Sequence, residues 1–290
     1  MREGLIIKGY GGFYYVRTGE KTWCCRGRGR LRLGQNLLTG DRVQFTPLDK
    51  GEGVIEEIKE RKNALPRPPV ANVDQVISVV SLAHPDPDLK LLNRSLVLCE
   101  LEKLSIVICF NKIDLIDSSQ AKDLEDIYRK AGYHTVFTSA LEGRGLEQLR
   151  QVIAGKISVL SGPSGVGKST LLNSLDPNLS LETGEISRKL KRGKHTTRYV
   201  ELIPLCDGFV ADTPGFSSLE LPSIKRTELG RCFPEINEFA AQCRFYDCIH
   251  LDEPDCEVKN ALEQGLISRA RYHDYKQFME EIISKERTYE

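Results

Sequence analysis

Short stretches of alternating apolar and polar residues, separated by glycine-containing turns, fill the first part of the chain. This period-two pattern predicts short β-strands. They are expected at about 4–9, 12–17, 21–26, 41–46 and 53–59. An open sheet this small would leave long unpaired edges, so the strands are expected to close into a barrel. An OB-type barrel is favoured, and an SH3-like barrel is the alternative.

The pattern changes at Leu65-Pro-Arg-Pro-Pro69, a stiff segment that predicts a linker. Apolar strand-like runs then alternate with stretches in which apolar residues recur at helical spacing. Strands are expected at 73–82, 105–110, 134–138 and 157–160, and helices at 89–102, 118–131 and 145–153. Such alternation predicts a parallel sheet with helices on both faces, which binds ligands at the carboxyl ends of its strands.

Beyond two further strands, at 199–205 and 208–211, the composition becomes mixed and polar. A final helix at about 266–286 has one apolar stripe, made of Tyr275, Phe278, Met279 and Ile282. We therefore expect a multidomain fold. It comprises an OB-type barrel at 1–64, a central α/β P-loop domain at 65–220 and a mostly helical region at 221–290.

Composition adds limits to this organisation. The 290 residues are 40% hydrophobic and 28% charged with a net charge of zero, so no global field favours nucleic acid or a membrane, and any basic surface must be local. The start has no apolar signal region, and no apolar run is long enough to span a membrane. We expect a cytoplasmic protein whose nine cysteines are thiols or metal ligands rather than disulfides.

A glycine-rich turn lies between the strand at 157–160 and an apolar helical run. Its pattern, Gly-x4-Gly-Lys-Ser, is typical of a loop whose backbone N–H groups curl around phosphate oxygens. Lys168 is expected to reach the β- and γ-phosphates and to take part in catalysis, and Ser169 to hold Mg²⁺. The residues expected to bind phosphate are Gly162, Pro163, Ser164, Gly165, Val166, Gly167, Lys168, Ser169 and Thr170.

Two turns that follow strands 105–110 and 134–138 indicate that the base is guanine. The Asp114 carboxylate can accept hydrogen bonds from guanine N1–H and N2–H2, a pair that adenine lacks. Asn111 is expected to tie its turn to the phosphate loop, and the stem of Lys112 to cover one face of the base. A backbone N–H in the second turn can donate to guanine O6. The residues expected at the base are Asn111, Lys112, Ile113, Asp114, Ser139 and Ala140.

Downstream segments supply further groups for a nucleotide and its Mg²⁺. Asp212 ends the strand at 208–211 and fits the carboxylate that holds the Mg²⁺ water shell, while the Gly215 N–H can meet the γ-phosphate. Thr196 or Thr197 would supply a hydroxyl to Mg²⁺, and the sequence does not choose between them.

Two residues bear on the rate of hydrolysis. Phe216 stands where many GTPases carry a glutamine that orients water, so intrinsic hydrolysis is expected to be slow. His195 is the nearest side chain able to hydrogen-bond water beside the γ-phosphate. The alternative is that His195 only contacts a partner or a phosphate.

A cysteine-rich segment follows, with the spacing Cys-x4-Cys-x-His-x5-Cys. Four such ligands can close a tetrahedral shell, which leaves no open position for catalysis and predicts a structural zinc site. Its ligands are Cys243, Cys248, His250 and Cys256. The remaining six cysteines have no such cluster of ligands near them in the sequence and are expected to be ordinary thiols.

A basic segment within the barrel predicts contact with RNA. Its arginines alternate with glycines, and no acidic residue interrupts them. They could lie along a phosphate backbone, with Trp23 or Tyr14 available to stack on a base. A solvated loop is the alternative. The residues are Lys21, Arg26, Arg28, Arg30 and Arg32.

The base-reading turns precede the phosphate loop, whereas an ordinary GTPase has them after it, so the order is that of a circular permutation. With this order, the barrel and the zinc segment, the chain resembles the circularly permuted, ribosome small-subunit-dependent GTPases (the RsgA family), in particular the shorter Gram-positive-type members. The resemblance implies that it binds GTP and GDP, the 30S subunit and its rRNA. It also implies hydrolysis of GTP stimulated by that subunit, and a role in late 30S maturation. We expect a monomer that binds neither DNA nor membrane.

Two other functions compete with this interpretation. One is an RNA-binding scaffold whose site only holds GTP, which Phe216 keeps open. The other is a small-molecule phosphotransferase that uses the same loop, against which Asp114 argues because a kinase rarely needs a guanine clamp. Potassium dependence has no support, since Gly165 stands where some assembly GTPases carry an asparagine.

Overall fold

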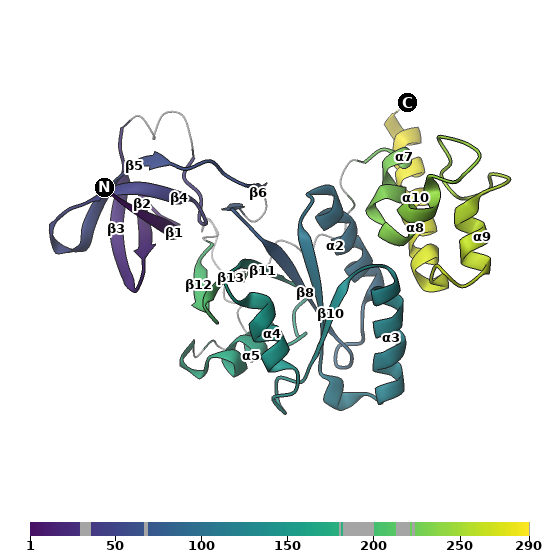
Figure 1. The fold of residues 1–290 in the computed structure, drawn as a ribbon, viewed down its shortest axis with the longest axis horizontal. Helices are drawn as coiled ribbons and strands as arrows, with labels where there is room; N and C mark the ends of the chain where they lie inside the picture. The colour runs from purple at the N-terminus through teal and green to yellow at the C-terminus, as the bar shows by residue number, and fades with distance from the viewer. Residues whose placement is uncertain are drawn as a thin grey trace. The chain divides into compact units, whose positions relative to one another are not determined.

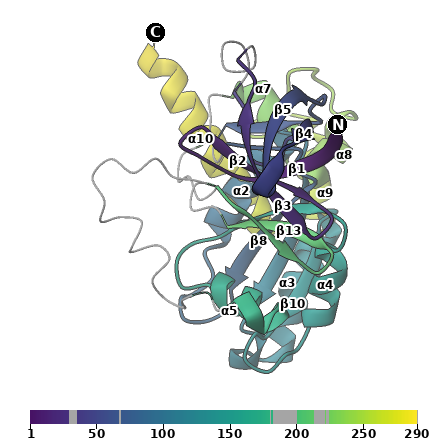
Figure 2. The ribbon, with the colours of Figure 1, turned by 90° about the vertical axis from the view of Figure 1, so that its left-hand side faces the viewer.

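The computed structural model describes residues 1–29, 36–66, 69–179, 181, 200–212, 221 and 224–289. Figures 1 and 2 show its helices and strands. The chain divides into two compact units. The first comprises Met1–Ile77 with Leu146–Phe216, and the second comprises Ser78–Gly145 with Ser217–Glu290. The division into domains at 1–64, 65–220 and 221–290 stays a prediction.

The N-terminal strands close into the expected barrel. They run in the order β1-β2-β3-β5-β4, with β4 paired to β1 and with β3 parallel to β5, an arrangement that fits the OB type. Alternate residues point inward and form the barrel core: Ile6, Val16, Cys25, Val43, Phe45 and Ile55. The strands are β1 (Arg2–Tyr10), β2 (Phe13–Thr18), β3 (Lys21–Gly27), β4 (Arg42–Pro47) and β5 (Glu52–Ile58).

The proline-rich segment predicted as a linker instead contributes to a two-stranded ribbon. β6 (Ala64–Pro66) pairs antiparallel with β7 (Pro69–Ala71), and Pro66 stands opposite Pro69. Proline lacks the N–H that a central strand needs, but a two-stranded ribbon leaves outer edges where that donor is not required. The composition correctly excluded a central strand and missed this edge arrangement.

The remaining strands form a six-stranded sheet in the order β10-β9-β8-β11-β13-β12. The pairs β10–β9 and β11–β13 are parallel, and β12 is an antiparallel edge strand. The α/β fold is therefore confirmed. The strands are β8 (Gln75–Ser81), β9 (Ser105–Asn111), β10 (His134–Thr138), β11 (Ile157–Ser161), β12 (Leu202–Leu205) and β13 (Gly208–Asp212).

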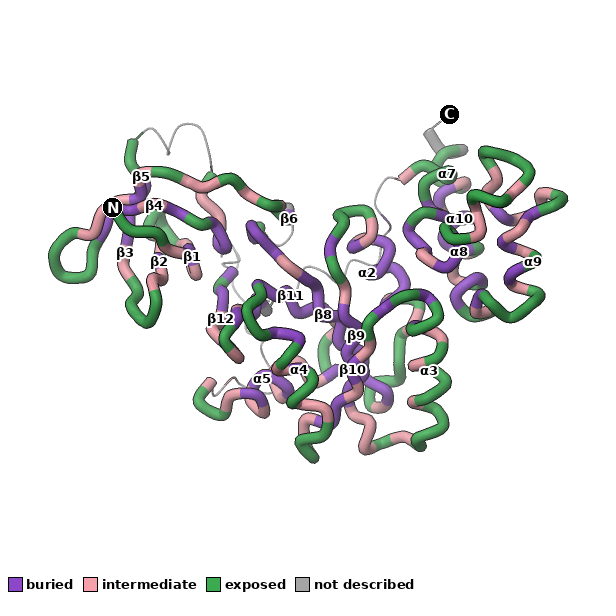
Figure 3. The backbone as a smooth tube through the Cα atoms, viewed as in Figure 1, coloured by how far each residue is buried: buried purple, intermediate pink, exposed green. Residues whose placement is uncertain are grey.

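In the second unit, α2 (Leu89–Leu101) is buried on two sides. Leu92 and Leu96 pack with strands β8 and β9 and with helix α3 (Ser118–Lys130) in one apolar cluster. Val97, on another side of α2, belongs to a second cluster with the C-terminal helices. This explains why residues 92–97 of α2 are buried without a gap, a pattern that a helix on a sheet surface does not show (Figure 3).

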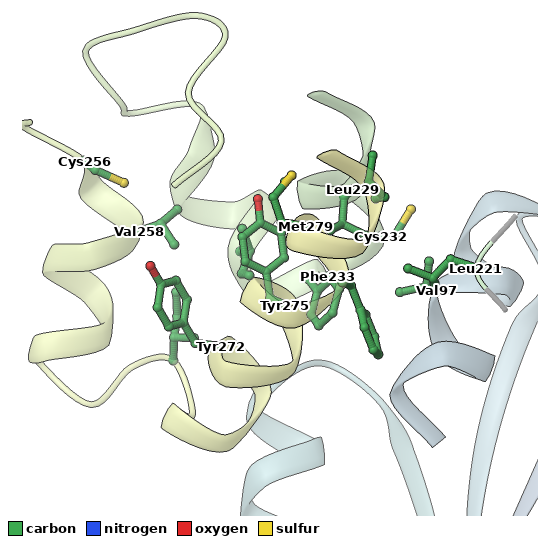
Figure 4. Close-up of a cluster of buried hydrophobic side chains, with 14 of the residues drawn as sticks. Val97, Leu221, Leu229, Cys232, Phe233, Cys256, Val258, Tyr272, Tyr275 and Met279 are labelled. Atoms are coloured by element: carbon green, nitrogen blue, oxygen red, sulfur yellow. The ribbon is translucent and has the colours of Figure 1, made fainter. Parts of the chain in front are cut away.

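The C-terminal region is mostly helical, as predicted. Aromatic and aliphatic side chains from its helices converge around Phe233, Tyr275 and Met279 (Figure 4). Its helices are α7 (Arg226–Leu229), α8 (Pro234–Ala240), α9 (Glu257–Glu263) and α10 (Arg269–Tyr289). No helix in the described part of the chain is long and apolar enough to cross a membrane.

Candidate nucleotide and metal sites

The phosphate loop joins β11 to α5 (Lys168–Leu175) in the first unit. All residues of β11 are buried, and on α5 the side chains of Leu171, Leu172 and Leu175 are buried too. Both ends of the loop are therefore anchored in the core. Gly162, Gly165 and Gly167 have φ values of 137°, 87° and 96°. Residues with a Cβ rarely adopt these values, which explains why glycine stands at these positions.

The Lys168 side chain folds back into this loop. Its Nζ donates to the carbonyl oxygens of Gly162, at 2.7 Å, and Pro163, at 3.0 Å. The ammonium group is therefore held inside the loop at the N-terminus of α5, where the helix dipole and backbone N–H groups also favour an anion. The arrangement suits the binding of a phosphate chain.

Asp212 lies beside the start of this loop, because its strand β13 pairs parallel with β11 and Asp212 stands opposite Leu160. The backbone thus places Asp212 at the same end of β11 as Gly162. His195, Thr196, Thr197, Gly215 and Phe216 lie outside the described residues, so their expected roles stay predictions. Ser169 on α5 and Asp212 on β13 offer the oxygen atoms that Mg²⁺ prefers as ligands, and their binding of this ion stays a prediction.

The two base-reading turns follow β9 and β10 in the second unit. Asn111 is 1% exposed, and its Oδ1 accepts a hydrogen bond of 3.1 Å from the Thr138 hydroxyl, which joins the ends of the two strands. Lys112 has a left-handed backbone with φ 67°, and its Nζ donates to the His84 carbonyl. Desolvation lowers the pKa of Lys112, although Asp114 opposes this shift.

The second turn is closed by its own hydrogen bonds. The Ser139 N–H donates to the Arg144 carbonyl at 3.0 Å, and the Ser139 hydroxyl accepts from the Glu142 N–H at 3.2 Å. The Ser139 N–H is thus engaged within the turn. The contacts of both turns with a base stay predictions.

The predicted zinc ligands lie together in the C-terminal region. Their ligand atoms are all within 4.8 Å of one another. His250 Nδ1 lies 3.6 Å from Cys243 Sγ and 3.5 Å from Cys256 Sγ, and these two sulfurs are 3.9 Å apart. A tetrahedral zinc ion with ordinary bond lengths separates sulfur from nitrogen by about 3.6 Å and sulfur from sulfur by about 3.8 Å. The four side chains could therefore hold zinc with little movement.

Backbone contacts orient the histidine of this Cys3His cluster. The Glu253 carboxylate accepts from the N–H groups of Ile249, at 2.8 Å, and Leu251, at 2.9 Å. The Tyr272 hydroxyl donates to the His250 carbonyl at 2.6 Å. Burial lowers the pKa of His250, which favours the neutral imidazole that a metal requires. Sequence reasoning missed these supporting residues because none is a metal ligand itself.

The barrel separates the predicted RNA-binding residues into several environments. Lys21 and Arg26 are exposed, whereas Arg28 forms an ion pair with Glu56, and Arg30 and Arg32 lie outside the described residues. Trp23 is half-buried and tilts against Phe45 of the barrel core, with 5.9 Å between ring centroids. Trp23 and Tyr14 thus pack partly buried against the core, and their stacking on a base stays a prediction.

Comparison with known proteins identifies the family. The model of the RsgA GTPase family matches residues 58–222, and that of the RsgA N-terminal domain matches residues 3–55. The chain belongs to the RsgA GTPase family. It is 49% identical to the small ribosomal subunit biogenesis GTPase RsgA of Moorella thermoacetica, over 99% of both chains. It is 47% identical to the protein of the same name from Bacillus cereus, over all of both chains.

Two solved structures of similar proteins extend this result to the fold. One is YloQ, a circularly permuted GTPase, with a TM-score of 0.82 and 41% identity over 98% of this chain and 96% of that one. The other is YjeQ from Thermotoga maritima, with a TM-score of 0.85 and 39% identity over 97% of this chain and 98% of that one. The predicted RsgA resemblance and fold class are therefore confirmed, and the chain is a GTP-hydrolysing enzyme of this family.

A buried polar network in this RsgA-family chain escaped the sequence analysis. Arg271 of α10 is 1% exposed and donates to both oxygens of Glu235 in α8, at 2.6 and 3.0 Å. It also donates to Asn93 Oδ1 of α2 at 2.7 Å. The network joins the C-terminal helices to α2, within the unit that carries the base-reading turns.

Proposed function

We propose that this protein binds the small ribosomal subunit through its rRNA and hydrolyses GTP to GDP and phosphate with stimulation by that subunit. It thereby assists late maturation of the subunit. The relatives carry the name small ribosomal subunit biogenesis GTPase. The protein acts as a monomer in the cytoplasm, where GTP and ribosomal subunits are found.

The observation that carries the proposal is the phosphate loop, with its three left-handed glycines and the ammonium group of Lys168 held inside. The loop provides for the phosphates of a nucleotide. The base-reading turns follow parallel strands β9 and β10 of the same six-stranded sheet, and ligands of such sheets bind at the carboxyl ends of the strands. Asp114 then selects guanine.

Each residue has a distinct role in this proposal. Lys168 neutralises charge on the β- and γ-phosphates, and Ser169, Asp212 and a threonine at 196 or 197 hold Mg²⁺. The ion would neutralise charge that develops on the phosphate oxygens during transfer. Phe216 cannot orient water, so His195 is assigned this task, in the geometry that the bound subunit imposes.

GTP turnover tests the proposal, with wild type and His195→Ala each assayed with and without 30S subunits. We expect stimulation in the wild type and a loss of about 10²-fold or more in the variant, the range of a positioned acid–base group. His273→Ala is the matched control, because His273 lies on the surface of α10 and its ring contacts Gln277 of the same helix. Full stimulation of His195→Ala would remove this residue from the mechanism.

The competing function is an RNA-binding scaffold whose GTP site is a slow or non-hydrolysing switch. Phe216 favours it, because the residue lacks the polar group that orients water. The same assay separates the two functions. Subunits that bind the wild type but leave its turnover unchanged would support the scaffold and contradict the stimulated enzyme.

A further inference from the structure

The outward side of the barrel sheet β1–β2–β3 carries three exposed aromatic residues. Tyr10, Phe13 and Tyr15 are 55%, 36% and 37% exposed. Tyr10 stands opposite Phe13 at the end of the β1–β2 hairpin, and Tyr15 follows two residues later on β2. Their neighbour Val16 is fully buried in the barrel core, so the alternation of β2 directs Phe13 and Tyr15 away from it.

A cation completes this surface. The Arg26 guanidinium lies 4.4 Å from the centroid of the Phe13 ring, from the neighbouring strand β3. Arg26 is exposed, and it forms no ion pair with any of the residues that the structure describes. An arginine stacked on an aromatic ring keeps its N–H groups available for phosphate oxygens. We call Tyr10, Phe13, Tyr15 and Arg26 the aromatic face.

Contacts within the first unit mark where the aromatic face ends. Lys8, which stands opposite Tyr15, forms a 2.7 Å ion pair with Glu201 beside β12. Arg17, two residues beyond Tyr15, has its guanidinium 6.0 Å from the Phe209 ring of β13. Side chains on the continuation of the same sheet surface thus make contacts with residues at and beside β12 and β13, and the aromatic residues stand beyond them. Their exposure is not explained by packing inside this unit.

We propose that the aromatic face binds unpaired bases of RNA, which stack on Phe13 and Tyr15 while Arg26 contacts a phosphate. Residues two apart on a strand are separated by about 6.6 Å, whereas bases stacked within one strand of a duplex rise by about 3.4 Å. Bases that use both rings must therefore be separated from each other, which a single strand permits and a duplex does not. The proposal rests on the rRNA binding proposed above and specifies which RNA the barrel selects.

The test measures binding of full-length protein to a fluorescent 12-nucleotide single-stranded RNA and to the duplex with its complement, over a range of salt concentrations. Phe13→Leu keeps an apolar side chain but removes the ring, and should weaken single-strand binding by about 5- to 150-fold with an unchanged salt slope. Phe13→Tyr keeps the ring and should bind like wild type. Arg26→Gln should reduce the slope by about one unit, since one phosphate contact is lost.

Controls keep this result independent of folding. Leu48→Ala removes an apolar side chain that is still more exposed, at 49%, from the loop after β4, and should change nothing. Thermal melts of all variants should coincide, because Phe13 lies outside the barrel core. Wild-type affinity in the double variant Phe13→Leu, Tyr15→Leu would overturn the proposal. An equal loss for single strand and duplex would overturn it too.

Turnover with 30S subunits separates this proposal from the general function. If subunits stimulate wild-type GTP hydrolysis but the double variant binds single-stranded RNA normally, the aromatic face is excluded and the proposed function stands. If wild type neither binds subunits nor responds to them, the proposed function fails, whatever the oligonucleotides show. Weakened binding of the double variant to both single-stranded RNA and subunits supports both.

Discussion

Replacing Glu235 by glutamine should destabilise the C-terminal helical region strongly, because it removes the charge that compensates buried Arg271. Burial alone would lower the pKa of Arg271, but Glu235 outweighs it and raises the pKa. The guanidinium is therefore charged at every accessible pH. Its surroundings include the ring of Phe233, 4.9 Å from the guanidinium carbon, and the side chain is only 1% exposed.

The expected loss follows from this geometry. Breaking a buried, bidentate ion pair on one side costs about 3–5 kcal/mol, since the remaining charge is left without compensation. At about 2–4 °C per kcal/mol, the midpoint of thermal unfolding should fall by about 6–20 °C. An exposed pair supplies the control. Glu125→Gln removes the partner of Arg129 on the surface of α3, where the two side chains are 40% and 70% exposed, and should cost less than about 1 kcal/mol.

A double variant tests whether charge rather than shape is responsible. Glu235→Leu with Arg271→Met removes both charges, so it should be less destabilised than Glu235→Gln. Asn93 keeps hydrogen bonds to Asp274, at 2.6 Å, and to Tyr128, at 3.2 Å, and is not left unsatisfied. Urea unfolding followed by circular dichroism measures all variants. The reasoning is refuted if Glu235→Gln costs no more than Glu125→Gln, or if the double variant is the less stable one.

Three further perturbations test other parts of the molecule. Asp114→Asn should shift nucleotide preference from guanine toward xanthine, because the amide can donate a hydrogen bond where the carboxylate accepted one. Competition between GDP and XDP measures this preference, and a retained preference for GDP would contradict the role of Asp114 in reading guanine. Burial, followed by the charge of Cys24, raises the pKa of Cys25 to about 12 from its usual 9.0. The stability that this shift contributes is complete below pH 9 and is lost as the pH rises toward 12, so Cys25→Ala should show a flatter unfolding profile over that range than wild type. Cys248→Ser should lower the zinc content and the stability of the C-terminal region while leaving GDP affinity within a few fold; atomic absorption and a nucleotide titration check this, and full zinc content would contradict the ligand assignment.

The barrel shows how far alternation in a sequence can be used. The strands were predictable because glycine turns separate short alternating runs, and all five formed near their expected positions. Which side faces inward was also available, since Val16 and Cys25 are the small apolar residues that suit a core. Tyr14 and Trp23 share their parity, whereas Phe13 and Tyr15 have the opposite one. Sequence reasoning named Tyr14 and Trp23 for stacking without weighing which side of its strand each occupies.

Local motifs were predictable for a different reason. The phosphate loop and the zinc ligands each lie within a short stretch, so spacing alone brings their side chains together. The ribbon β6–β7 was missed because its two strands are stabilised by pairing with each other, which composition does not report. Contacts with a partner far along the chain give a weaker signal in the local sequence pattern.

Arg271 gives such a weak signal. It precedes Tyr275, Phe278 and Ile282 at intervals of four, three and four residues, so it lies on the apolar stripe of α10. A charge in that position must either face solvent at a helix end or have a buried partner, because an unpaired buried charge costs more than the fold can lose. The stripe therefore leaves a buried acid as one of two outcomes and does not name it. Glu235 is 36 residues away in α8, and Asn93 is 178 residues away in α2, so no local spacing could name them. Only the packing of these three helices decides the partners.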